Sequence, residues 1–143
     1  MQLTENFTVA EFERSATATK HGIDNTMRGN VLVNAKELCL KVLQPARDAL
    51  NMPLTVSAGY RSSGLNPLVG GAKNSHHMYG MAADVKCKDN RAFFEYVREN
   101  LPFTQLIWEY GDDNQPQWVH VSYDKRDIRK QVLRIDHNGR REM

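Results

Sequence analysis

An aspartate and a histidine each lie inside a stretch that otherwise has the composition of a buried β-strand. Asp84 belongs to the apolar run 81–85, and His120 stands between two valines in the run Trp118–Ser122. An ionised carboxylate is costly to bury unless it is paired or bound to a cation. Side chains alternate along a strand, so Trp118, His120 and Ser122 share one face. Any fold of this chain must therefore supply partners for two ionisable groups within its sheet.

Two further imidazoles, His76 and His77, lie just before the strand that holds Asp84. Gly80 lies between them and Asp84 and breaks a helix, so we expect a loop that feeds a strand beginning near Ala82. Two imidazoles and a carboxylate form the set that holds a catalytic zinc ion and leaves one coordination position for water. The spacing alone leaves two interpretations open, a zinc site and a group of ordinary hydrogen-bonded side chains.

The size and composition of the chain indicate one globular domain over residues 1–143, with a basic, solvated tail from about residue 136. Its 41% hydrophobic and 25% charged residues exclude a disordered or collagen-like chain. A net charge of +2 does not indicate nucleic acid, and no apolar run approaches the roughly 20 residues of a membrane span. We therefore expect a monomer with neither a nucleic-acid nor a membrane partner.

The N-terminal stretch MQLTENFTVAEF lacks the basic and apolar regions of a signal peptide. We therefore expect synthesis in the cytoplasm, with delivery to any outside substrate by another agent. Cys39 and Cys87 form no CxxC pair, so neither a disulfide framework nor a thiolate zinc site is indicated.

Hydrophobic periodicity predicts helices early in the chain and strands later. Helices are expected from Thr8, over 32–51 with a kink or boundary at Pro45, and from an Asn90 cap to Leu101; residues 15–27 and 62–74 are expected as loops. Strands are expected at 54–57, 82–86, 105–110, 117–123 and 131–135. This order predicts an α+β domain with helices packed on one face of a small antiparallel sheet.

The string from Ser75 to Asp84 resembles SxHxxGxAxD, the signature of the M15 peptidases, which include zinc D-alanyl-D-alanine carboxypeptidases and phage L-alanyl-D-glutamate endopeptidases. Residues 57–62 and 65–71 resemble the SxGYRS and LNxxVGG blocks of the small single-domain branch, and 118–122 resembles its WVHVS block. The resemblance runs from about Phe7 to about Ser122 and implies the hedgehog-like α+β fold of that superfamily.

Carried over to this chain, the resemblance implies that His77, Asp84 and His120 are the ligands of one zinc ion. His76 falls at a variable position of the motif and is expected to be a neighbour. Arg61 resembles the arginine that engages the substrate carbonyl or carboxylate, a role that suits a planar guanidinium. We expect Ser75 to brace the loop that carries His77 by hydrogen bonding. The residues expected to line the site around the ligands are Ser57, Asn66, Ser75 and Trp118.

The chain departs from the family pattern at one catalytic position. Relatives carry a glutamate or aspartate three residues before the last ligand, where this chain has Gln117, and glutamine cannot exchange a proton. If the hairpin pairs Tyr110 with Gln117, Glu109 faces Trp118 on the ligand side of the sheet, whereas a one-residue slip turns it away. Glu109 is therefore the expected general base, and the loop aspartates at 112 and 113 are weaker alternatives.

These residues together predict a zinc metallopeptidase that acts on peptidoglycan stem peptides at the bacterial cell wall. The expected cut is at a D-alanyl bond near the C-terminus of the stem, and an endopeptidase cut within the stem is the close second alternative. A lone small domain fits phage-type lysis, in which a holin releases the enzyme. Gln117 keeps an alternative open, a catalytically impaired zinc-containing module that binds peptidoglycan without cutting it.

Overall fold

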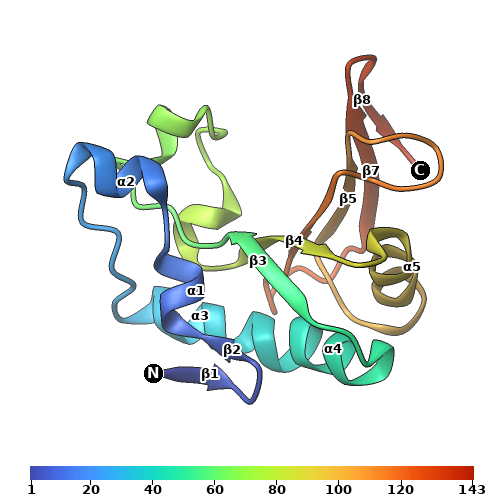
Figure 1. The fold of residues 1–143 in the computed structure, drawn as a ribbon, viewed down its shortest axis with the longest axis horizontal. Helices are drawn as coiled ribbons and strands as arrows, with labels where there is room; N and C mark the ends of the chain where they lie inside the picture. Colours follow the sequence, from blue (N-terminus) through green and yellow to red (C-terminus); the bar gives the residue numbers. More distant parts are fainter.

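A six-stranded sheet organises the protein, whose structure is a computed structural model that describes residues 1–143 (Figure 1). Its strands are β3 (Leu54–Ala58), β4 (Ala82–Cys87), β5 (Gln105–Glu109), β6 (Trp118–Ser122), β7 (Gln131–Asp136) and β8 (Gly139–Glu142). They lie in the order β3-β4-β6-β5-β7-β8, and every neighbouring pair is antiparallel except β5 and β7. A separate pair, β1 (Gln2–Thr4) and β2 (Phe7–Thr8), lies near the N-terminus.

This sheet is larger than the small antiparallel sheet that the sequence predicts, and it is mixed. The connection 123–130 carries the chain past the start of β5, where the Lys130 N–H donates to the Phe103 carbonyl at 3.2 Å and the Gln131 N–H to the Thr104 carbonyl at 3.0 Å. β7 therefore starts beside the start of β5 and runs parallel to it. The basic residues expected as a solvated tail form β8, an exposed strand at the edge of the sheet.

The helices are α1 (Val9–Glu13), α2 (Ala16–His21), α3 (Asn30–Leu38), α4 (Gln44–Leu50) and α5 (Asn90–Asn100). The expected capping box of α1 is present, since Thr8 and Glu11 bond each other's backbone. The prediction of a continuous loop over 15–27 is wrong, because the Ser15 side chain accepts from the Ala18 N–H and starts α2. Its sequence lacks an apolar period because only Ala18 is buried.

Pro45 changes the helix type instead of ending the helix. Residues 30–50 are helical throughout, and a π-helical segment, η1 (Cys39–Leu43), joins α3 to α4. The Gln44 N–H reaches back to the Cys39 carbonyl, one residue further than in an α-helix. Pro45 has no N–H and its ring crowds the preceding turn, which a wider turn accommodates. The expected boundary at Pro45 is thus confirmed as a local change within one long helical element.

The cap of α5 lies one residue earlier than predicted. Asp89 accepts from the Ala92 N–H, whereas Asn90 accepts from the Cys87 N–H at 2.8 Å and donates to the Pro116 carbonyl at 3.0 Å. Both residues are good cap formers, so local sequence does not separate them. Asn90 instead ties α5 to the loop that precedes β6.

Helices cover one face of the sheet, as predicted. Figure 1 shows α3 and α4 running along one side of β3 and β4, with α5 beside them. Val85, Val119 and Val121 are fully buried in a cluster with Leu38 and Val42 of the long helical element. Asp84 and His120 alternate with these valines and therefore project from the opposite face.

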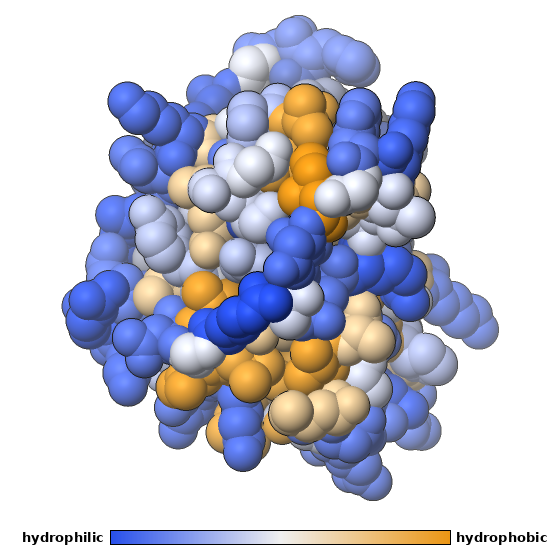
Figure 2. Space-filling model, turned by 90° about the vertical axis from the view of Figure 1, so that its left-hand side faces the viewer, coloured by the Kyte–Doolittle hydropathy of each residue, from blue (hydrophilic) through white to orange (hydrophobic).

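The surface on the side of α2 and residues 62–75 carries apolar side chains in patches between hydrophilic ones (Figure 2). Leu68 and Val69, in the 3₁₀-helix η2 (Asn66–Val69), are 52% and 41% exposed. The expected surface loop therefore contains one short helical turn. None of the helices combines the length and the apolar character that a membrane crossing requires.

Candidate metal centre

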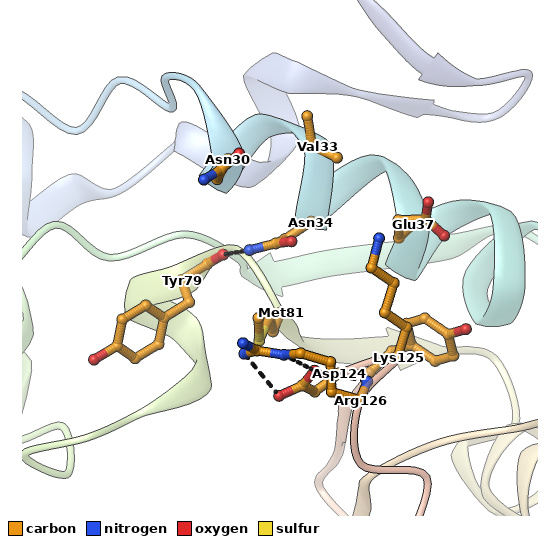
Figure 3. Close-up of a pocket in the computed structure, with 10 residues that line it drawn as sticks. Asn30, Val33, Asn34, Glu37, Tyr79, Met81, Asp124, Lys125 and Arg126 are labelled. Carbon is orange, nitrogen blue, oxygen red and sulfur yellow. Dashed lines mark hydrogen bonds and ion pairs between the residues drawn. The ribbon is translucent and has the colours of Figure 1, made fainter.

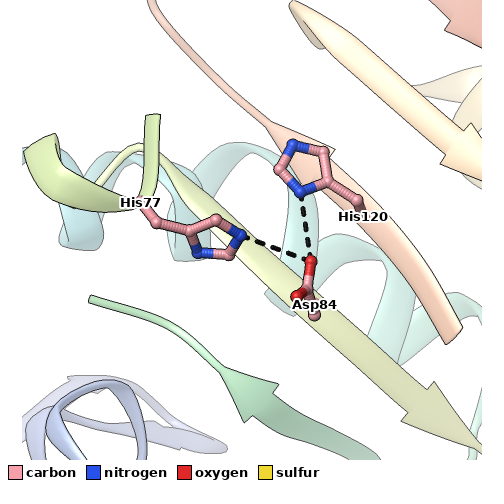
Figure 4. Close-up of side chains that lie close together, drawn as sticks. All are labelled: His77, Asp84 and His120. Atoms are coloured by element: carbon pink, nitrogen blue, oxygen red, sulfur yellow. Dashed lines mark hydrogen bonds and ion pairs between the residues drawn. The ribbon is translucent and has the colours of Figure 1, made fainter. Parts of the chain in front are cut away.

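Strand register brings Asp84 and His120 together. They are direct partners in the antiparallel pair β4–β6, so both side chains leave the sheet on the same face. The Asp84 Oδ1 atom lies 3.1 Å from His120 Nδ1 (Figure 4). The side chain of each is 12% exposed. The two ionisable groups that the strands carry are thus partners of each other.

His77 reaches the same point from a 3₁₀-helix, η3 (His76–Tyr79). The Ser75 hydroxyl accepts from the His77 N–H at 3.1 Å and caps this turn, which is the bracing contact expected of Ser75. The His77 Nδ1–H donates to the Gly59 carbonyl at 2.6 Å, a contact that selects the tautomer with a free Nε2. That Nε2 lies 3.3 Å from Asp84 Oδ1, and the His77 and His120 rings are 5.1 Å apart.

The chemistry of this donor set fits a zinc ion. One ligand atom from each of His77, Asp84 and His120 lies within 4.8 Å of the others, and Figure 4 shows the three side chains converging. Although burial opposes ionisation, the two imidazoles hold the pKa of Asp84 well below its usual range. An ionised carboxylate with two imidazole nitrogens is a ligand set that zinc prefers, and three protein ligands leave a position open.

Glu109 lies on the ligand face, in the register that the sequence predicts. β5 pairs with β6 so that Glu109 is opposite Trp118 and Ile107 is opposite His120. The Trp118 Nε1–H donates to Glu109 Oε2 at 2.9 Å. Burial raises the pKa of the Glu109 carboxyl, and the charge of Asp84 raises it further. A carboxyl group with a raised pKa therefore lies beside the three candidate ligands.

The other acidic candidates, in the loop 111–116, have partners of their own. Asp112 accepts from the backbone N–H groups of Asn114 and Gln115, and the exposed Asp113 forms an ion pair with Arg134 at 2.8 Å. The Gln117 side chain is exposed at the start of β6.

A support for the end of β5 at Glu109 comes from β7 and the turn that follows it, a contact that the sequence does not predict. Tyr110 follows Glu109 in the left-handed region (φ 56°), and its N–H donates to the Ile135 carbonyl at 2.8 Å. The Tyr110 ring packs 5.4 Å from that of Trp118 and 5.5 Å from that of His137. Glu109 thus ends a strand whose exit is tied to the C-terminal hairpin, and no local pattern near Glu109 signals this.

Arg61 lies on the other flank of the candidate ligands. Its Nη2 atom is 3.7 Å from Asp84 Oδ2, and its backbone N–H donates to the His77 carbonyl at 3.1 Å. The side chain is 19% exposed, so the guanidinium retains access to the surface. The structure therefore brings Arg61 to the cluster.

Ser57 and Asn66 have mainly backbone contacts. The Ser57 hydroxyl donates to the Asp84 carbonyl at 3.2 Å. Asn66 is 3% exposed and donates to the Ala72 carbonyl at 2.8 Å, while its Oδ1 lies against Gly71. Asn66 thus closes the loop that precedes Ser75.

His76 lines a pocket together with Asn74, Tyr79 and Asp124. It is not among the three converging donors. This position agrees with the expectation that His76 is a neighbour.

Gly80 makes the turn from η3 into β4 possible. It has φ 73°, and an added Cβ would lie 2.4 Å from the Val31 carbonyl oxygen. We expect Gly80→Ala to lower the free energy of unfolding by about 2 kcal/mol or more, from strain and this clash together. Gly22→Ala is the matched control, because Gly22 has φ 64° and open space around it. Urea unfolding of both variants measures the difference, and equal losses would contradict a role for the Val31 contact.

Comparisons with known proteins agree with this geometry. Residues 5–122 match the family model described as Peptidase M15. Over 83 residues, 56% of this chain, the sequence is 43% identical to the zinc D-Ala-D-Ala carboxypeptidase of Streptomyces albus G. The match covers 31% of that relative's length. The β7–β8 hairpin lies outside the residues that match the family model.

Proposed function

Because the chain belongs to the peptidase M15 family, we propose that it is a zinc-dependent peptidase that hydrolyses peptidoglycan stem peptides. The observation that carries the proposal is the convergence of His77, Asp84 and His120 within 4.8 Å, on the same sheet face as Glu109. The relative from Streptomyces albus G, named as a zinc carboxypeptidase, supports both the metal and the substrate class. The place of action is then the bacterial cell wall.

In the proposed reaction, each flank of the site has its own task. When bound by the three ligands, zinc supplies Lewis acidity toward the scissile carbonyl and lowers the pKa of water. Glu109 accepts a proton from the attacking water and delivers it to the leaving amine. Arg61 holds a substrate carboxylate or the developing oxyanion through its N–H groups. The His77 bond to Gly59 keeps that imidazole in one orientation throughout.

The bond that we propose is a D-alanyl bond near the C-terminus of the stem peptide. The name of the 43% identical relative supports this choice, because it describes removal of a terminal D-alanine. A cut within the stem, of the endolysin type, is the second candidate. Synthetic stem peptides with free and blocked C-termini separate the two, because only a carboxypeptidase requires the free terminal carboxylate.

An assay of the purified protein on isolated cell walls tests the function. We expect new free amino groups to appear with zinc and to be lost with a chelator. Wall binding that depends on metal, without any released product, would instead establish a binding module and overturn the peptidase proposal. Glu99→Gln is the matched control, because Glu99 is an exposed carboxylate on α5 outside the site, and it should release the same amount of product.

The hydrogen bond from Trp118 to Glu109 has a measurable consequence for the pH profile. Glu109 acts as a base only when ionised, so kcat falls as the pH drops through its raised pKa. The Trp118 N–H favours the ionised form. Trp118→Phe should therefore raise the pKa and move the acid limb of the kcat profile to higher pH. On that limb kcat should fall by about tenfold or less.

A pH series on Trp118→Phe and Trp108→Phe makes this comparison. Trp108 lies on the same strand pair, but its indole N–H donates to the Asp112 carbonyl instead. An unchanged acid limb in Trp118→Phe would show that this hydrogen bond does not act on the base.

A further inference from the structure

A groove lies between α3 and the chain that follows β6 (Figure 3). Its larger part has a volume of about 350 Å³, and a smaller part of about 200 Å³ reaches His76. The two parts share Tyr79, Met81, Asp124 and Arg126, so they form one continuous surface, called here the α3 groove. His76 precedes the candidate ligand His77, and the groove therefore begins beside the metal centre.

The α3 groove lies on the side of the metal centre opposite Glu109. Glu109 is paired with Trp118 at the start of β6, whereas Asp124 follows the end of that strand. From His120 to Asp124 the chain advances about 13 Å, at roughly 3.3 Å per residue. A peptide cleaved at the metal centre therefore reaches the groove with a residue only a few positions from the scissile bond.

One stripe of α3 forms the outer wall of the groove. Asn30, Val33, Asn34 and Glu37 recur at helical spacing and all line it. They span about 10 Å along the helix axis, which suits one long side chain or about three residues of extended peptide. The Asn34 amide donates to the Tyr79 carbonyl at 2.9 Å, as Figure 3 shows. This bond ties the wall to η3 and sets the width of the groove.

The groove offers two unpaired charges of opposite sign. No ion pair within the chain involves Glu37 or Lys125. Figure 3 shows both at the same end of the groove. Asp124 and Arg126 neutralise each other instead, with Nε and Oδ1 3.2 Å apart. The end of the groove thus presents one carboxylate and one ammonium group to a ligand.

We propose that the α3 groove selects stem peptides whose middle residue carries both an ammonium and a carboxylate group at the end of its side chain. Glu37 binds that ammonium group, and Lys125 binds that carboxylate. A side chain with an ammonium group alone leaves Lys125 facing a like charge, so a diamino-dicarboxylic residue is preferred over lysine. The inference rests on the proposed function in taking a stem peptide as the ligand.

The test uses two synthetic stem peptides that differ only in the middle residue, meso-diaminopimelate in one and lysine in the other. Calorimetric titration of the zinc-loaded protein measures binding, and product release measures turnover. We expect roughly tenfold tighter binding of the diaminopimelate peptide, with a correspondingly lower KM. Glu37→Gln and Lys125→Gln should each reduce that preference several-fold, through weaker binding and a higher KM for the diaminopimelate peptide.

Glu99→Gln is the matched control, because Glu99 is an exposed carboxylate on α5 that lies outside the groove. It should keep the full preference. Equal binding of both peptides by the unaltered protein, or a preference that survives both groove variants, would overturn the inference. Selective binding without hydrolysis would uphold the groove and refute only the peptidase activity.

Discussion

Replacing Glu109 with glutamine is expected to lower kcat by about two to four orders of magnitude. The amide keeps the size of the side chain and an acceptor for the Trp118 N–H, but it cannot take a proton from water. Zinc content should be unchanged, since Glu109 is not among the three converging donors. Steady-state kinetics on a stem peptide, together with metal analysis of the purified variant, make the measurement.

A matched variant makes this prediction decisive. Glu99→Gln removes a carboxylate from α5, outside the site, and should retain full turnover. If Glu109→Gln alone keeps most of its kcat, the assignment of Glu109 as the base is wrong.

Asp84→Asn is expected to abolish tight zinc binding and the stability that zinc confers. Zinc at 100 times its dissociation constant stabilises a folded protein by about 2.7 kcal/mol, which for a chain of this size raises Tm by roughly 5–10 °C. The asparagine amide preserves the shape of the side chain but removes the negative charge that lies between the imidazoles of His77 and His120. Thermal unfolding with added zinc and with chelator measures the effect.

The neighbouring histidine provides the control for this experiment. His76→Gln changes a residue that lines the α3 groove, so zinc should still raise Tm by the full amount. A full zinc-dependent shift in Asp84→Asn would contradict the ligand assignment. Loss of the zinc-dependent shift in His76→Gln would instead mean that His76, and not His77, binds the metal.

Local pattern predicted where two of the three candidate ligands, Asp84 and His120, would lie, whereas the choice of His77 over His76 came from the resemblance of its motif to the family signature. Asp84 and His120 each interrupt an apolar strand, and alternation places both on the face opposite the buried valines. The expected register of the β5–β6 hairpin is confirmed, and with it the position of Glu109 on the ligand face. These features depend on neighbours in sequence and on a single hairpin, so a strand period of two is enough to predict them.

Contacts between distant segments could not be predicted in this way. The parallel pairing of β7 with β5 depends on where the connection 123–130 crosses the sheet, and the sequence of β7 carries no sign of its partner. The support of Tyr110 by Ile135 and His137 follows from that pairing. The basic segment from about residue 136 has the composition of a solvated tail, but its pairing with β7 makes Gly139–Glu142 a strand.

The sequence by itself therefore predicted most of the helices, strands β3 to β7, the three candidate ligands and the sheet face that carries Glu109, but neither α2 nor β8. Only the tertiary structure decided how these groups are held and what surrounds them. The Gly59 carbonyl that orients His77 and the α3 stripe that faces Asp124 come from segments far apart in the chain. Periodicity reports which face of one element is buried, whereas the partner of that face is set by packing across the whole fold.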